Sequence, residues 1–126
     1  MQTLKWIVLT VAFIEGSWLT FDGTRALTVG DYLTARSGPR AGQLGPWSRV
    51  VSALGFEPRS TLIKCVHLVL GIAWLMALMI FAVRPASGWW AILGCSIASL
   101  WYLPMGTVLS VLIIVLLLTP QLRSLQ

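Results

Sequence analysis

Residues Cys65–Val83 form a run of 19 residues without a formal charge. A helix that crosses a hydrocarbon core of ~30 Å needs about 20 apolar residues, so this run predicts a membrane-spanning helix. Ser60 is suited to cap the N-terminus of the helix, and Pro85 is suited to follow its end. We therefore place one span at residues 61–83.

The composition of the whole chain agrees with a membrane protein. Hydrophobic residues make up 57% of the 126 residues, charged residues make up 10%, and the mean hydropathy is +0.84. Soluble globular domains are less apolar and more charged than this. The length leaves room for a single transmembrane domain, residues 1–126, with about four spans.

A second span is predicted near the N-terminus, at residues 4–21. Trp6 and Trp18 lie near its two ends, where amphipathic rings settle at membrane interfaces, and only Glu15 interrupts the apolar run. No A-x-A-like cleavage site follows. We expect a retained span rather than a signal peptide.

The C-terminal part stays apolar from Trp89 to Thr119, which is too long for one untilted span. The motif "WYLPMG" divides it, because Leu103 precedes a proline and Pro104 suits the first turn of a new helix. We predict a hairpin of two spans, residues 86–102 and 104–118. The fold class is therefore an all-α, integral membrane four-helix bundle.

The loop 22–60 is rich in glycine and proline, but its second half predicts a short helix that begins at Pro46 and ends at Gly55. Trp47, Val50, Val51 and Leu54 follow at helical spacing and form one apolar stripe. Such a helix lies on the membrane or caps the mouth of a pocket. The alternative is an ordinary loop helix packed on the bundle, and the pattern favours neither.

The basic residues indicate orientation rather than nucleic-acid binding, because they are scattered singly and form no phosphate-binding stripe. Six of them lie on the loop side and three on the side of the termini, which predicts a cytoplasmic loop. The two sets are Arg25, Arg36, Arg40, Arg49, Arg59 and Lys64, against Lys5, Arg84 and Arg123.

Motifs for cofactor or metal chemistry are not found in the sequence. Two cysteines and one histidine cannot build a closed zinc site, and no Walker, dinucleotide-binding, nucleophile-elbow or HExxH motif occurs. We expect no metal and no cofactor. Cys65 and Cys95 are expected at different depths, about 6 Å and 12 Å from the loop side, which disfavours a disulfide.

Small residues recur every four positions in the third predicted span, at Ala91, Cys95 and Ser99. Such faces let helices approach closely in lipid. Packing within the bundle is the simpler interpretation, and contacts in a homo-oligomer or with a partner subunit are the alternative.

Glu15 is the most unusual residue of the chain, since an isolated carboxylate in hydrocarbon is costly. Glu15, Trp18 and Asp22 share one helix face, and Asp22 can pair with Arg25 or end the helix. Counted from the loop-side ends of their spans, Glu15 and His67 both lie at a depth of about 9 Å. We expect the two side chains to meet inside the bundle.

A candidate pocket follows from this depth. Lys64, His67, Gly71 and Trp74 share a face of their helix, and Gly71 leaves a gap beside the indole that could admit a flat or lipidic ligand. In the alternative, Glu15 and His67 only satisfy one another and fix the helix register. The predicted ligand-binding residues are Glu15, Trp18, His67, Gly71, Trp74, Ser99 and Ser110.

The stretches "EGSWLTFDGTRALTVGDY", "AGQLGPWSRVV" and "WYLPMGT" resemble those of small bacterial integral membrane proteins, and the four-helix plan is similar to the DoxX-like group. The resemblance implies a compact bundle in the bacterial inner membrane. It implies no catalytic residues.

Three functions are compatible with these features. We favour a non-enzymatic accessory subunit, or a binder of a small hydrophobic ligand such as a lipid or quinone. The alternative is a membrane enzyme that acts on a lipidic substrate, with Glu15 and His67 as acid and base. A proton-coupled carrier is a third hypothesis, weakened because the sequence shows no internal repeat.

Overall fold

The computed structural model describes residues 2–34, 37–39, 41–102 and 104–126. This part of the chain is all-α, as predicted, and contains no strand. Arg36, Arg40 and Leu103, which entered the predictions of orientation and of the hairpin, lie outside the described residues. The helices are α1 (Gln2–Val29), α2 (Trp47–Ala53), α3 (Thr61–Val83), α4 (Pro85–Ala98), α5 (Met105–Leu117) and α6 (Pro120–Arg123).

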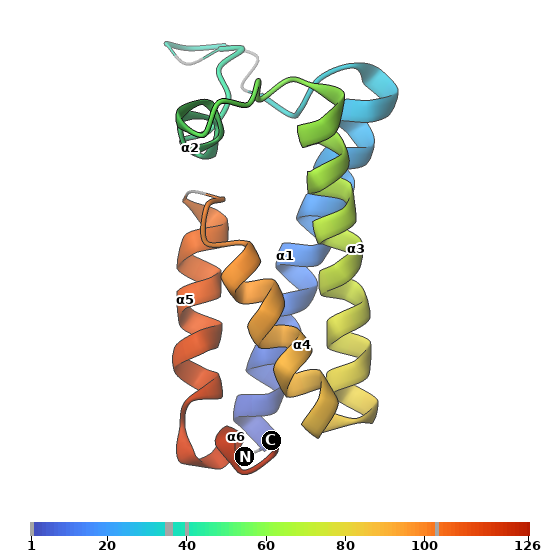
Figure 1. Cartoon of the computed structure of the whole chain (residues 1–126), viewed down its shortest axis with the longest axis vertical. Coiled ribbons are helices and arrows are strands. Elements are labelled where there is room, and N and C mark those ends of the chain that lie inside the picture. The colour runs from blue at the N-terminus through green and yellow to red at the C-terminus, as the bar shows by residue number, and fades with distance from the viewer. Residues whose placement is uncertain (1, 35–36, 40, 103) are drawn as a thin grey trace.

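Helices α1 and α3 form a long antiparallel pair, and glycines determine how closely they approach (Figure 1). A Cβ atom added at Gly23 of α1 would lie 2.6 Å from the backbone nitrogen of Leu68. One added at Gly71 of α3 would collide with the backbone of Thr20. The two backbones therefore pack directly on one another at these positions, which only glycine permits.

The predicted boundaries of α3 are confirmed. The Ser60 hydroxyl accepts a hydrogen bond from the backbone N–H of Ile63 (3.4 Å), so Ser60 is the N-cap. The helix ends at Val83, and Pro85 is the first residue of α4 after a one-residue connection. Pro85 thus ends one helix and begins the next, where its missing N–H is not needed.

The break at Pro104 is also confirmed, although α4 ends earlier than expected. Helix α4 stops at Ala98 rather than near Tyr102, and α5 begins at Met105. The intervening turn is closed by backbone hydrogen bonds that include one from Tyr102 N–H to Ser99 O (3.1 Å). Gly106 allows the turn to fold back closely, since a Cβ there would lie 2.7 Å from the Ser99 carbonyl oxygen.

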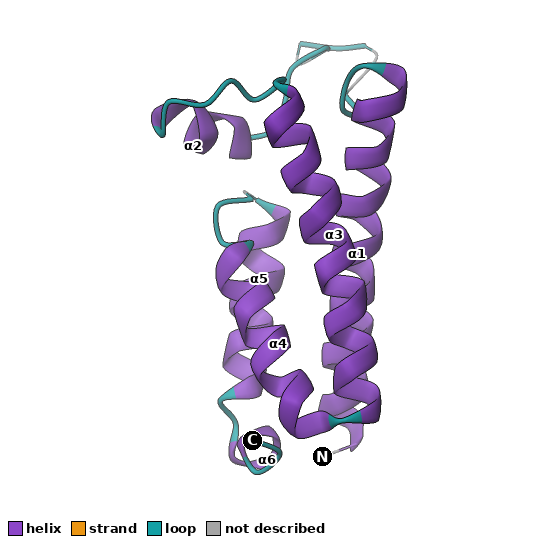
Figure 2. Cartoon of the chain, turned by 45° about the vertical axis from the view of Figure 1, so that its right-hand side comes forward, coloured by secondary structure: helices purple, strands orange, loops and turns teal. Residues whose placement is uncertain are grey.

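Four helices, α1, α3, α4 and α5, run up and down alongside one another, with both termini at one end (Figures 1 and 2). The long loop and the α4–α5 turn lie at the opposite end. The short helix α6 lies at the end of the termini.

The short helix in the loop is confirmed as α2, which follows Pro46 and is closed by Gly55 in a left-handed conformation (φ +93°). Figures 1 and 2 show α2 above the α4–α5 turn, at the loop end of the molecule. Trp47 and Val51 are the buried residues of α2, as the apolar stripe predicted, whereas Leu54 is exposed.

Helix α1 differs most from its prediction. It continues for two turns beyond Phe21 and ends only at Val29, before Gly30 (φ +107°). Asp22 therefore does not end the helix. Asp22 accepts a hydrogen bond from the Leu33 N–H (2.7 Å). Arg25 donates instead to the carbonyl oxygens of Asp31 (2.8 Å) and Tyr32 (2.9 Å), so the expected Asp22–Arg25 pair is not formed.

By length and composition, α1 and α3 are the two helices of the described chain that could cross a membrane. Helices α4 and α5 are apolar but contain only 14 and 13 residues. The structure thus supports an all-α protein with two candidate spans. The four-span arrangement is a proposal.

Candidate functional site

His67 lies at the centre of an aromatic cluster at the loop end of the bundle. Its ring centroid is 4.5 Å from that of Trp47, 4.8 Å from Tyr32, 5.3 Å from Tyr102 and 5.5 Å from Trp101. These rings come from α2, from the segment after α1 and from the α4–α5 turn. We call these five side chains the aromatic cluster; it joins α2, the segment after α1 and the α4–α5 turn to α3.

The hydrogen bonding of His67 fixes the state of its ring. Nδ1 lies 2.9 Å from the carbonyl oxygen of Ile63. Because a carbonyl only accepts, Nδ1 carries the hydrogen, and Nε2 of the neutral ring is left as an acceptor. Nε2 is buried and has no hydrogen-bond partner among the described residues. An unpaired buried acceptor of this kind costs about 1–3 kcal/mol.

Tyr32 is held against His67 by hydrogen bonds to Pro58 and to Arg25, a polar residue near the end of α1. Its hydroxyl donates to Pro58 O (2.9 Å), and its own carbonyl accepts from Arg25 Nη1 (2.9 Å). Asp22 holds the next residue, Leu33, in place. Burial, together with the nearby carboxylates, raises the pKa of Tyr32, so its hydroxyl is a neutral donor.

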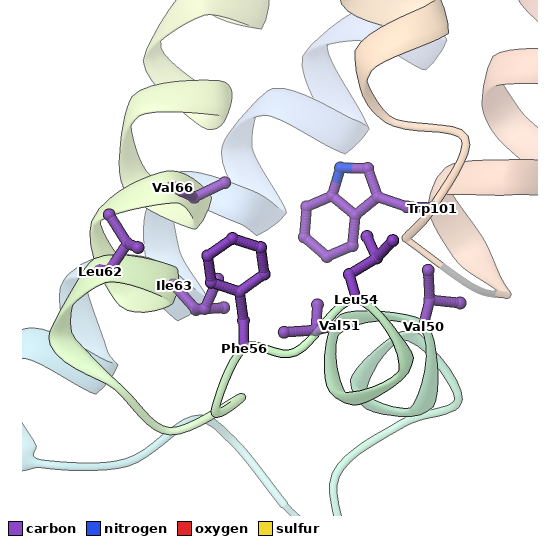
Figure 3. Close-up of a pocket in the computed structure, with 8 residues that line it drawn as sticks. All are labelled: Val50, Val51, Leu54, Phe56, Leu62, Ile63, Val66 and Trp101. Atoms are coloured by element: carbon purple, nitrogen blue, oxygen red, sulfur yellow. The ribbon is translucent and has the colours of Figure 1, made fainter.

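A cavity of about 220 Å³ lies beside this cluster, between α2, the start of α3 and the α4–α5 turn (Figure 3). Every residue that lines it is apolar. In Figure 3, Leu54 and Val51 rise from α2, the Phe56 ring lies between α2 and α3, and the Trp101 indole projects over α2 from the α4–α5 turn. The lining residues are Val50, Val51, Leu54, Phe56, Leu62, Ile63, Val66 and Trp101.

Two residues connect the cavity to the aromatic cluster. The Trp101 indole lines the cavity and packs edge-on against the His67 ring. The Ile63 side chain lines the cavity, while its carbonyl accepts the hydrogen bond from His67. His67 thus lies directly behind the apolar wall.

A second space of about 230 Å³ has the Trp47 indole in its wall. It is more polar than the first, because Asp22 belongs to its wall. Trp18 also lines it, and the Trp18 indole donates a hydrogen bond to the Tyr102 hydroxyl (2.8 Å). The full lining is Trp18, Asp22, Leu33, Gly45, Trp47, Tyr102, Pro104 and Met105.

A separate polar group lies deeper in the bundle, around Glu15. The Glu15 side chain is fully buried and its neighbour is the Ser110 hydroxyl. Neither group completes a hydrogen bond of good geometry within the described chain. Nearby, the Trp74 indole donates to the Ser99 hydroxyl (2.8 Å), so those two residues are satisfied.

The expected contact between Glu15 and His67 is wrong. Gly16 of α1 packs against Trp74, whereas Gly23 packs against His67 and Leu68. Glu15 therefore lies about seven residues, or roughly 10 Å, further along the helix pair than His67. A depth measured from Phe21 places Glu15 too near the loop end, because α1 ends only at Val29. The acid–base pair expected of a membrane enzyme is not assembled.

The gap expected beside Gly71 is not present either, because the backbone of α1 at Thr20 fills it. The structure thus divides the predicted pocket. His67 belongs to the aromatic cluster, Trp18 to the second space, and Gly71 to the α1–α3 contact. The rest belong to the deeper group: Glu15, Trp74, Ser99 and Ser110.

None of the seven predicted pocket residues lines the 220 Å³ cavity. Its walls come from the apolar stripe of α2 with Phe56, from the start of α3, and from Trp101 of the "WYLPMG" turn. Both motifs are visible in the sequence, and a cap over a pocket mouth is one interpretation of the first. That the two motifs meet in space is not visible in the sequence.

Metal binding has no structural support in the described chain, where no three His, Cys, Asp or Glu side chains gather. Cys65 and Cys95 are free thiols.

No protein-family model matches the chain, and comparisons with curated proteins and with solved structures give no match either. The resemblance to the DoxX-like group therefore stays a prediction.

Proposed function

We propose that this chain is a multi-pass membrane protein that binds the hydrocarbon chain of a lipid in the 220 Å³ cavity under α2. The observation that supports this most directly is the composition of the wall, which is apolar throughout. Binding sites for small molecules are typically mostly apolar concavities of this kind.

The size of the cavity fits a segment of a hydrocarbon chain. An engineered apolar cavity of ~150 Å³ already binds benzene, so about 220 Å³ accommodates a larger apolar group. Burial of such a group stabilises the complex by about 0.8 kcal/mol per CH₂.

The surroundings of the cavity favour entry from a membrane rather than from water. Three of its lining residues are largely exposed: Leu54 (69%), Phe56 (48%) and Leu62 (57%). Exposed apolar residues around a concave site suit contact with lipid, and α2 suits a position at the interface. A location in a bacterial inner membrane, a cytoplasmic loop and assembly with further copies or subunits are also parts of this proposal.

The proposal is tested by filling the cavity from α3. Val66 lines it, whereas Val69 lies on the same helix, is 64% exposed and does not line it. Val66→Phe should lower the binding of dodecyl methyl ether by roughly fivefold to a hundredfold, because overpacking a filled site costs about 1–3 kcal/mol. Val69→Phe should leave binding unchanged.

Binding is measured by native mass spectrometry in a mild detergent, as the fraction of protein that carries one ether molecule. The proposal fails if wild type retains no ether, or if both phenylalanine variants bind as wild type does.

A further inference from the structure

We infer that the ligand of this cavity carries a hydroxyl group, and that His67 Nε2 accepts the hydrogen bond from it. The inference rests on the proposed function and adds the chemical class of the ligand: a neutral long-chain alcohol or phenol.

The His67 ring is neutral and has one acceptor without a partner in the described chain. Nδ1 donates to the Ile63 carbonyl, so Nε2 presents a lone pair. It is fully buried and has no partner in the described part of the chain. Buried polar groups are nearly always paired, and a buried group without a partner points to an unseen one.

His67 lies next to the wall of the cavity. Its ring packs against Trp101, which lines the cavity, and it is bonded to Ile63, which also lines it. A ligand whose chain fills the cavity therefore has its inner end next to the Trp101 indole. Trp101 lies in the turn between α4 and α5 rather than in a helix. Because the cavity lining does not include His67, the indole must move aside for the hydroxyl to reach Nε2.

The chemistry of Nε2 disfavours anionic head groups. Nε2 in this tautomer only accepts, so a carboxylate or a phosphate, which also only accepts, gains no hydrogen bond from it. The other four members of the aromatic cluster are neutral Trp and Tyr side chains, and no Lys or Arg is among them. An anionic head group would thus be buried with no cation among the side chains of the cluster, since Arg25 donates to the Tyr32 carbonyl, and such burial is costly.

The test is a competition between two probes that differ only in the donor. Wild-type protein in a mild detergent is mixed with equal amounts of 1-dodecanol and dodecyl methyl ether, and native mass spectrometry gives the ratio of the two complexes. We expect the alcohol to be favoured about tenfold, because it satisfies a buried acceptor that the ether leaves unpaired. In His67→Leu the ratio should fall to about one.

The outcomes separate the two proposals. If wild type binds both probes equally and Val66→Phe abolishes both, the cavity binds chains but the role of His67 is wrong. If wild type binds neither probe, the cavity proposal fails and this inference fails with it. The wild-type ratio does not depend on whether His67→Leu folds. A ratio that stays near ten in a folded His67→Leu would also overturn the inference.

Discussion

Glu15 and His67 are both fully buried in the α1–α3 pair, yet they lie at different levels of it. Glu15 lies near the level of Trp74 and His67 lies at the level of Gly23, roughly 10 Å nearer the loop end. Each has polar atoms without a hydrogen-bond partner in the described chain. They are therefore two separate groups rather than an ion pair.

The separation of Glu15 from His67 predicts additive effects on stability. Glu15→Leu should raise the free energy of unfolding by about 1–3 kcal/mol, because it removes buried oxygens that lack partners. The double change with His67→Leu should equal the sum of the two single changes within about 0.5 kcal/mol. Chemical unfolding in detergent gives all three values. Coupling well beyond that margin would mean that the side chains interact after all.

The close contact of α1 and α3 predicts opposite effects for two glycine substitutions. Gly71→Ala should destabilise the protein by about 1–3 kcal/mol, since its new Cβ would meet the backbone at Thr20. Gly94→Ala is the matched control on α4, where a Cβ meets nothing within 4 Å. It should stabilise by about 0.5–1 kcal/mol, as alanine does in a helix interior. Equal effects at both positions would contradict the packing described for Gly71.

The exposed ion pair between Asp31 and Arg59 predicts a small pH dependence. The Arg59 Nε donates to the Asp31 carboxylate at 3.1 Å. Partial burial alone would raise the pKa of Asp31, but the hydrogen bonds from Arg59 and from the Tyr32 N–H lower it below the ordinary 3.8. Because the folded-state pKa is lowered, the stabilisation is present above pH 3.8 and is lost as the pH falls through the lowered value.

Asp31→Asn should therefore lower the free energy of unfolding by about 0.2–1 kcal/mol at pH 7, the usual range for an exposed pair. The difference from wild type should shrink in high salt and vanish at a pH below the lowered pKa. A difference that is unchanged in strong acid would show that the carboxylate charge is not its cause.

The four-span proposal predicts that the loop and the C-terminus lie on opposite sides of a membrane. Ser37 and Ser124 are exposed, and serine-to-cysteine changes there are nearly isosteric. In a background without Cys65 and Cys95, each single cysteine should react with an impermeant maleimide from one side only, and from different sides. Labelling from the same side would exclude the four-span arrangement. Labelling of Ser37→Cys from outside would overturn only the predicted orientation.

The sequence predicted those helices whose limits are set locally. The Ser60 cap and the uncharged run Cys65–Val83 determine α3, and Pro46 and Gly55 determine α2. Proline and glycine act on their own backbone, so their effects need no knowledge of distant residues. The break at Pro104 was predictable for the same reason.

The end of α1 was not predictable in this way. The polar stretch after Phe21 resembles a loop, but in the structure Gly23 packs on the backbone of Leu68 and the helix continues. Tertiary packing thus overrides local preference. The aromatic cluster was missed because His67 is surrounded by residues from three segments that are far apart in the sequence, Tyr32, Trp47 and the Trp101–Tyr102 pair.

The unequal helix lengths have a consequence for the surrounding bilayer. Helix α3 is about 35 Å long, whereas α4 and α5 are only about 21 Å and 20 Å long. A bilayer around the proposed multi-pass protein would therefore border the long helix α3 on one side and the short helices α4 and α5 on the other. Helix α2 lies above the two short helices (Figure 2), where longer helices would continue. Lipids on that side would be thinned, so short or disordered chains should gather beside the mouth of the cavity.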